Sequence, residues 1–221
     1  FTMQWFATHR TKRLPTGEYE SILGSPDTTF ADTRVALEAR YEPRLSDSVT
    51  SLSRAHVNLY YFKNRTAYTA DNGGVASEVY DGRWAGFEQR FLITPSKSLR
   101  ITAGGEAQRH FTAALEGTDN RGSYLDAARP YSVLAAYAVA DANLHAKVKL
   151  SAGARYDYVS SSQGSLNPRG ALILHPYAAG TVKIMGGRAF RAPSIYELVY
   201  QGATQRAANS LNPETVYSGE L

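Results

Sequence analysis

Cysteine is absent from the 221 residues, which excludes a disulfide framework and any thiolate metal site. No apolar run approaches the roughly 18 to 20 residues that a membrane-spanning helix requires. The mean hydropathy of -0.35 is typical of a soluble protein, but a membrane strand also averages near neutral because only alternate residues face lipid. These absences exclude a bundle of membrane helices and leave a soluble β-domain or a membrane β-barrel open.

A strong charge of one sign is absent as well. The formal net charge is +4, the pI is near 9.2, and residues of both signs are interspersed. Because no basic run or basic helix occurs, the charge gives no argument for nucleic acid and at most agrees with an anionic ligand or lipopolysaccharide phosphates. The chain lacks the charged start and apolar stretch of a signal peptide. Its first and last residues resemble strand interiors, so we expect a piece truncated at both ends.

Alternation with a period of two recurs along the chain, whereas helical periodicity is scarce. In residues 33–42, Val35 and Leu37 fall on one face while Arg34 and Glu38 fall on the other. The predicted strands cover residues 31–42, 49–62, 82–93, 98–113, 131–140 and 146–159. Most of them reach the roughly 9 to 11 residues of a tilted membrane strand. We expect a shared outer face that carries Val35, Leu37, Ala39, Val57, Leu59, Ile101, Val148 and Leu150.

Short and long connections alternate between these segments. The short ones contain the Pro, Gly, Asn and Asp of tight turns and cover residues 42–48, 94–97, 140–145 and 176–180. The long ones are polar and cover residues 11–30, 63–81, 116–130 and 191–212, with 160–167 as a shorter member. Short periplasmic turns and long extracellular loops are typical of an outer-membrane barrel. The sequence therefore predicts an all-β fold, an antiparallel membrane β-barrel segment of about ten strands that is open and incomplete.

Tyrosine is abundant, with 15 residues, and several lie at strand ends beside turns or loops. These are Tyr41, Tyr60, Tyr61, Tyr131, Tyr156, Tyr158 and Tyr200. Such positions suit the aromatic girdle of a membrane barrel. Tyrosine is also a good strand former in any sheet, so both interpretations stay open.

Four stretches in the C-terminal half resemble motifs of TonB-dependent outer-membrane receptors. They read L-S-A-G-A-R-Y-D from Leu150, N-P-R-G-A-L from Asn167, G-R-A-F-R-A-P-S from Gly187 and N-S-L-N-P-E from Asn209. Each motif alone has little specificity, but their order and spacing over residues 146–221 resemble this family of siderophore and vitamin receptors. We therefore interpret residues 1–221 as part of the barrel domain of such a receptor.

The resemblance implies a gated importer of a scarce chelate and not an enzyme, with a ferric siderophore as first candidate ligand and a cobalamin-like corrinoid as second. It implies a plug domain within a barrel of about 22 strands and an N-terminal segment that engages the TonB complex. Neither can be placed in these residues. It also implies a position in the Gram-negative outer membrane, in contact with lipid and lipopolysaccharide. No cofactor is expected, and residues 194–208 lack the histidine of the family's haem receptors.

The charged face of the predicted strands is expected to point into the barrel lumen. Its members are Arg34, Glu38, Arg40, Arg54, His56, Glu88, Arg90, Glu106, His110, Lys147, Lys149, Arg155 and Asp157. Under one interpretation some of them contact the plug or the passing ligand. Under the other they pair with one another across strands, as the wall of an ordinary sheet does.

The loop 191–212 is expected at the extracellular rim, because the strand at 181–190 ascends from the short turn at 176–180. Its candidate ligand-binding residues are Arg191, Tyr196, Tyr200, Gln201, Gln205 and Arg206. They offer hydrogen-bond donors and flat amphipathic surface of the kind that binding sites use. The alternative is a loop that packs only on its neighbours.

Two other functions remain open from the residues alone. A passive porin would share the alternation and the asymmetric connections but would have an open lumen and no plug. A barrel hydrolase would need loop carboxylates and a histidine, for which Asp71, Asp81, Asp119 and His110 are the candidates. Because no H-E-x-x-H or G-x-S-x-G motif occurs, we assign no catalytic and no metal-ligating residue.

Overall fold

The computed structural model describes residues 1–15, 19–202, 205–208 and 210–221. Its elements in chain order are β1 (Thr2–Arg13), β2 (Thr29–Tyr41), β3 (Arg44–Ser46), β4 (Val49–Ala67), a short 3-10 helix (Ala70–Asn72), β5 (Val75–Ser96), β6 (Leu99–Asp119), β7 (Gly122–Ala128), β8 (Tyr131–His145), β9 (Val148–Val159), β10 (Ser165–Leu174), β11 (Val182–Arg191), α1 (Ile195–Val199) and β12 (Glu214–Glu220). Within this part of the chain, no helix has the length and apolar character needed to cross a membrane.

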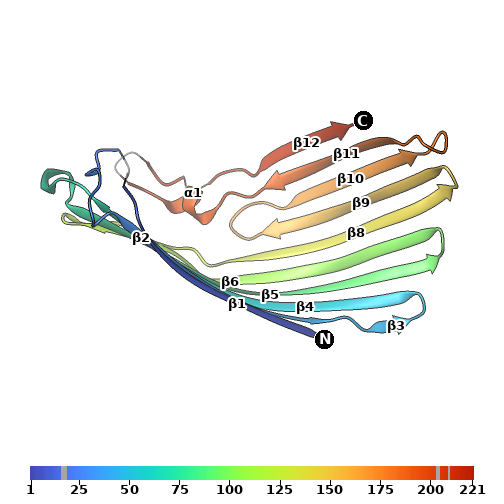
Figure 1. The fold of residues 1–221 in the computed structure, drawn as a ribbon, viewed down its shortest axis with the longest axis horizontal. Helices are drawn as coiled ribbons and strands as arrows, with labels where there is room; N and C mark the ends of the chain where they lie inside the picture. The colour runs from blue at the N-terminus through green and yellow to red at the C-terminus, as the bar shows by residue number, and fades with distance from the viewer. Residues whose placement is uncertain (16–18, 203–204, 209) are drawn as a thin grey trace.

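The strands form one antiparallel sheet (Figure 1). Its order is β1-β2-β4-β5-β6-β8-β9-β10-β11-β12, with β3 beside β4 and β7 beside β6. Strands that follow one another in the chain therefore lie side by side, as in a meander of hairpins. The sheet is not closed, because β1 and β12 lie at its two edges. The prediction of an open, antiparallel barrel segment of about ten strands is confirmed.

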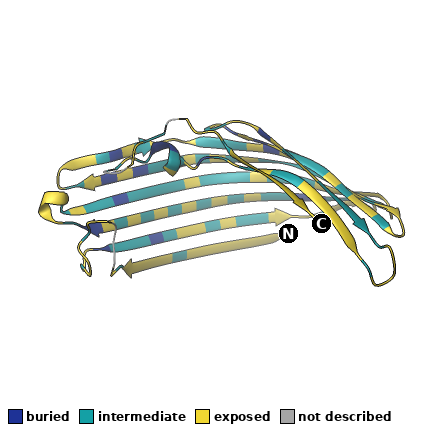
Figure 2. Ribbon diagram, turned by 90° about the horizontal axis from the view of Figure 1, so that it is seen from above, coloured by how far each residue is buried: buried dark blue, intermediate teal, exposed yellow. Residues whose placement is uncertain are grey.

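The register gives the sheet an apolar face and a charged face, names that we keep below. On the apolar face, Leu37 pairs with Trp5 on one side and Val57 on the other, and Val57 is 50% exposed. On the charged face, the Glu88 side chain is only 16% exposed. Figure 2 shows exposed and covered residues alternating along the strands. An exposed apolar face and a covered charged face reverse the usual rule for a protein in water and fit a sheet with lipid outside.

The predicted outer residues lie together on the apolar face, in the pairings that the register gives for β2, β4, β6 and β9. The strand-end tyrosines divide between the two faces. Those that are exposed on the apolar face, where a girdle lies, are Tyr41, Tyr61, Tyr156 and Tyr158. The girdle interpretation is wrong for the other three, because Tyr60 and Tyr131 lie on the charged face and Tyr200 packs in a small core.

A β-bulge in β6 shifts the alternation of that strand. Trp84 pairs with His110 but Arg83 pairs with Thr112, so Phe111 is an extra residue. Before the bulge, the even-numbered residues of β6 lie on the charged face. Beyond the bulge, the odd-numbered Leu115 lies on that face. The strand predicted at 98–113 therefore continues past the bulge to Asp119. Arg109 lies within it, and its guanidinium donates to the Ser132 hydroxyl at 3.0 Å.

Several links that were predicted as loops are strand. The link at 63–81 shrinks because β4 continues to Ala67 and β5 begins at Val75, and the link at 116–130 contains the end of β6 and all of β7. The short link at 140–145 belongs to β8. At roughly 3.3 Å per residue, the 22 residues of β5 extend about 70 Å, more than a tilted crossing needs. The polar ends of these strands therefore continue the ladder beyond the apolar band.

A small hydrophobic core lies at the end of the sheet with the longer connections. It contains Leu115, Leu125, Leu198 and Val199. The last two come from α1, a helix that the sequence interpretation did not contain (Figure 1). Its start is fixed by a capping box, in which the Ser194 side chain accepts from the Glu197 backbone and the Glu197 side chain accepts from the Ser194 backbone. The loop after β11 is therefore folded against the sheet.

Candidate functional site

An ion-pair network crosses the charged face from β2 to β5. Glu38 accepts hydrogen bonds from Arg40 Nε at 2.6 Å and from Arg54 Nε at 2.7 Å. Arg54 also lies 3.7 Å from Glu88, which in turn lies 3.9 Å from Arg90. Each carboxylate thus sits between two guanidinium groups, one from its own strand two residues away and one, Arg54, from the neighbouring strand β4.

A second network joins β6 to β9. Arg155 donates to Glu106 at 3.0 Å and to Asp157 at 2.6 Å. Tyr137 connects the two networks, because its hydroxyl donates to Glu88 at 2.6 Å while the Arg155 guanidinium lies 5.6 Å from its ring centroid. The structure thereby brings together eight of the predicted lumen residues, which are Glu38, Arg40, Arg54, Glu88, Arg90, Glu106, Arg155 and Asp157.

The two predicted lumen histidines make different contacts. His110 is stacked between Trp84 and Tyr131, with ring centroids 5.4 Å and 4.0 Å away. His56 is hydrogen-bonded to Asn58 at 2.8 Å. In the described part of the chain, no three His, Asp or Glu side chains gather in a way that could hold a metal ion. The histidines are therefore part of the wall's polar and aromatic contacts.

The remaining predicted lumen residues are Arg34, in the middle of β2, and Lys147 and Lys149, near the turn between β8 and β9. The Arg34 guanidinium lies 4.9 Å from the centroid of the Tyr60 ring. Lys147 is in the turn between β8 and β9, where its ammonium donates to the Pro176 carbonyl at 3.2 Å. Lys149 is exposed near the start of β9. These three are separate from the two ion-pair networks.

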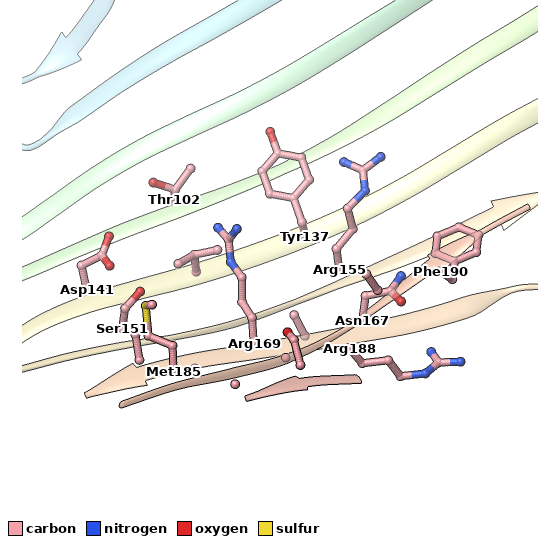
Figure 3. Close-up of a pocket in the computed structure, with 18 of the residues that line it drawn as sticks. Thr102, Tyr137, Asp141, Ser151, Arg155, Asn167, Arg169, Met185, Arg188 and Phe190 are labelled. Atoms are coloured by element: carbon pink, nitrogen blue, oxygen red, sulfur yellow. The ribbon is translucent and has the colours of Figure 1, made fainter. Parts of the chain in front are cut away.

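A groove of about 940 Å³ lies on the charged face, lined by residues from β5 and β6 and from β8 to β12 (Figure 3). Arg155 and Arg169 project into it from neighbouring strands, beside Tyr137. Gly187 pairs with Arg169 and leaves room because it has no side chain. The sequence interpretation quoted Arg169 in a motif but gave it no role. Arg169 follows Asn167 by two residues and therefore lies on the same face of the strand, and this spacing is the sequence signal that could have identified it.

Arg191 is held at the base of the loop by two carboxylates. Its guanidinium donates to Glu197 at 2.9 Å and to Glu214 at 2.7 Å. The pKa of Glu197 is lowered to about 2, because Arg191 and the donors of Ser194 stabilise its charged form. The predicted ligand residue Arg191 therefore has its charge engaged within the chain.

The two predicted loop tyrosines point inward. The Tyr196 ring stacks on Tyr200 with centroids 4.4 Å apart and meets the Tyr80 ring edge-on at 6.0 Å. The Tyr200 hydroxyl donates to Glu78 at 2.7 Å. These side chains form an aromatic layer over β5, in which Tyr200 is partly buried while Tyr196 keeps 40% of its surface exposed.

The glutamines and Arg206 complete the predicted loop set. Gln201 donates to the Tyr124 carbonyl at 3.0 Å, and Gln205 accepts from the Tyr196 hydroxyl at 3.4 Å. Gln205 and Arg206 are exposed. Asn209, which opened the last of the four motifs, lies outside the described residues. The structure thus divides the set into an anchored part near α1 and an exposed tip.

Sequence reasoning missed Glu78, which fell in a segment interpreted as loop. Glu78 is 7% exposed. Its carboxylate accepts hydrogen bonds from the hydroxyl groups of Tyr80 at 2.7 Å, Tyr124 at 3.1 Å and Tyr200 at 2.7 Å. Tyr124 and Tyr200 are 46 and 122 residues away in the chain. No local pattern in the sequence could have joined these four side chains.

Solved structures of the same fold are siderophore receptors. A point mutant of the ferric enterobactin receptor PfeA from Pseudomonas aeruginosa has a TM-score of 0.67 and 14% identity, over 89% of this chain and 32% of that chain. A PfeA mutant in complex with enterobactin has a TM-score of 0.63 and 17% identity, over 89% and 33%. The siderophore receptor PirA from the same organism has a TM-score of 0.50 and 13% identity, over 98% and 48%. This chain spans about a third of PfeA.

No curated protein matches the chain significantly. The family model described as TonB dependent receptor-like, beta-barrel matches residues 4–221. This match extends the resemblance from the four C-terminal motifs to almost the whole chain, and it agrees with the meander of long strands and its two faces. The chain therefore belongs to the TonB-dependent receptor family, as a part of its β-barrel, and this is a family of receptors and not of enzymes.

Proposed function

We propose that the intact protein is an outer-membrane importer of a scarce metal chelate, driven by the TonB complex. A ferric siderophore is the first candidate ligand and a cobalamin-like corrinoid the second. The observation that carries the proposal is the match to the receptor barrel over residues 4–221. The enterobactin complex among the structures of the same fold favours the siderophore.

The charged face supports a passage for a polar ligand. Its carboxylates are paired, so the wall is polar without leaving buried charges unsatisfied. Along the groove, Arg169 presents a guanidinium group beside the ion-paired Arg155, and its planar set of N–H donors suits anionic oxygens of a chelate or backbone oxygens of a plug. The apolar face supports contact with membrane lipid and lipopolysaccharide on the opposite side of the sheet.

The proposed partners lie in the rest of the receptor. Residues 1–221 are part of one barrel domain, a plug domain fills that barrel, and the TonB complex acts on an N-terminal segment. Ligand binds among the extracellular loops, and the TonB complex uses the inner-membrane proton gradient to move the plug. In the loop 191–212, exposure makes Gln205 and Arg206 our first candidates for ligand contact.

Uptake by cells tests this function. The full-length receptor is expressed in a Gram-negative strain without other chelate receptors, and radioactive iron is supplied as a catecholate, a hydroxamate or a carboxylate siderophore, with radioactive cobalamin as a separate probe. We expect saturable uptake of one siderophore class that disappears when TonB is deleted. Uptake without TonB would indicate a passive porin and contradict the proposal. No uptake of any probe by a surface-expressed receptor would also contradict it.

A further inference from the structure

The segment 192–202, which we call the inner arm, reaches strands that are not neighbours of β11. In the sheet order, β8, β9 and β10 lie between β11 and β6. Nevertheless, Leu198 and Val199 of the arm pack with Leu115 of β6 and Leu125 of β7. Leu125 and Leu198 are each 1% exposed. The arm therefore lies over the charged face at the end of the lumen with the longer connections.

Glu78 is the polar centre of this contact. Its covered carboxylate accepts from three tyrosine hydroxyls, of which Tyr200 belongs to the arm. Hydrogen bonds to a charged acceptor are stronger than those between neutral groups. A covered carboxylate that loses a donor also keeps an unsatisfied charge. Lifting the arm would thus remove Tyr200 from Glu78 and expose the leucines beneath.

Further contacts of the arm run in the same direction. Tyr196 lies between Tyr80 of β5 and Tyr200, in stacked or edge-on contact with each. Gln201 donates to the backbone of β7 at Tyr124. Apolar packing, ring stacking and hydrogen bonds therefore all connect the arm to β5, β6 and β7, and Glu78 contributes the carboxylate among these contacts.

We infer that Glu78 is the positioning residue of the ligand-capture loop. It holds the inner arm across the outer end of the lumen, so that the loop presents its tip with Gln205 and Arg206 and keeps Tyr196 and Tyr200 turned inward. The exposed guanidinium at the tip selects for an anionic chelate. The inference rests on the proposed function only for the role of the loop in capture, because the position of the arm is tested without ligand.

A cysteine reporter measures whether the arm lifts. Residues 1–221 contain no cysteine. Leu125→Cys in the full-length receptor, with any cysteine elsewhere replaced by serine, places one thiol beneath the arm, and its labelling by a membrane-impermeant maleimide reports opening. Labelling of the receptor without this substitution gives the background. Tyr200→Phe removes one hydroxyl and keeps the stacked ring, and Glu78→Gln removes the charge. We expect either change to raise the labelling rate at least tenfold, with unchanged heat-modifiability of the barrel.

The matched control and the double variant decide the result. Tyr177→Phe changes an exposed tyrosine in the turn between β10 and β11 and should leave the labelling rate unchanged. Because Tyr200 acts through Glu78, the double variant should label no faster than Glu78→Gln alone. Multiplicative effects of the two changes would overturn the inference, as would an unchanged rate in a folded single variant. If Glu78→Gln prevents assembly, Tyr200→Phe decides. The labelling rates do not depend on uptake. A receptor that imports none of the probes would therefore contradict the proposed function without changing the result for Glu78.

Discussion

Single carboxylates of the charged face are stable because they are covered and paired at the same time. Asp157 is 6% exposed and accepts from Arg155 at 2.6 Å and Asn167 at 3.2 Å. A covered carboxylate without such donors would be costly. At this scale, pairing across strands describes the contacts of Arg54 and Arg155 with Glu38, Glu88 and Glu106. Arg40, Arg90 and Asp157 instead form ion pairs within their own strands, and contact with ligand or plug remains a prediction.

Asp157→Asn should lower the free energy of unfolding of the full-length receptor by about 1–3 kcal/mol, because the charged acceptor of Arg155 and Asn167 is lost. Urea-induced unfolding in detergent micelles measures this difference. The control is Asp47→Asn, whose carboxylate is fully exposed in a turn and should change the free energy by less than about 0.5 kcal/mol. Equal effects of the two substitutions would show that the network does not stabilise the barrel.

The lowered pKa of Glu197 predicts how the start of α1 depends on pH. A carboxyl group whose pKa falls from 4.5 to about 2 on folding stabilises the folded state above pH 4.5, and this contribution is lost as the pH falls through about 2. Hydrogen exchange of residues 191–200, corrected at each pH with an unstructured peptide, should show protection that declines only in this window. Glu197→Gln should reduce this pH dependence, and Glu214, which also accepts from Arg191, is the source of the remainder. Loss of protection already above pH 5 would contradict the assignment.

At the scale of elements, the sequence predicts the faces of the strands better than their ends. The alternation identified the apolar face of β2 and β4, because a period of two is independent of neighbours. It underestimated β4 and β5, because their polar ends resemble loop while backbone pairing across the hairpin continues. The bulge at Phe111 and the contact between α1 and β7 depend on residues distant in the chain. The capping box of α1 was present in the sequence, but a five-residue helix has little periodicity to reveal it.

Two adjacent residues of β6 test which face meets lipid. Ala103 lies on the apolar face, where it pairs with Phe91 and Ala138, and Thr102 lines the groove on the charged face. Ala103→Arg should destabilise the barrel by about 2–4 kcal/mol if this position lies near the bilayer midplane. Thr102→Arg should cost clearly less, as measured by reversible unfolding in lipid vesicles. A larger cost for Thr102→Arg would mean that the faces are assigned the wrong way round.

The whole sheet has an exposed apolar face and unpaired edges, and both are unfavourable in water. Its apolar face exposes Trp5, Val57 and Phe87, at 79%, 50% and 49%, and its edge strands β1 and β12 present unpaired backbone groups. The isolated 221-residue chain should therefore aggregate in water and become dispersed in detergent. Sedimentation velocity measures this directly. A stable monomer without detergent would contradict the membrane assignment of the apolar face.

The central claim is that this sheet forms a wall between lipid and a polar lumen, and nitroxide scanning of β4 tests it most directly. Single cysteines at residues 54–59 of the full-length receptor are spin-labelled in lipid bilayers, and collision with lipid-soluble oxygen is compared with collision with a water-soluble nickel chelate. We predict a period of two. The collision rate with oxygen, relative to that with the nickel chelate, should be high at Ala55, Val57 and Leu59. The same ratio should be low at Arg54, His56 and Asn58. Equal accessibility at both sets, or the reverse pattern, would contradict the account.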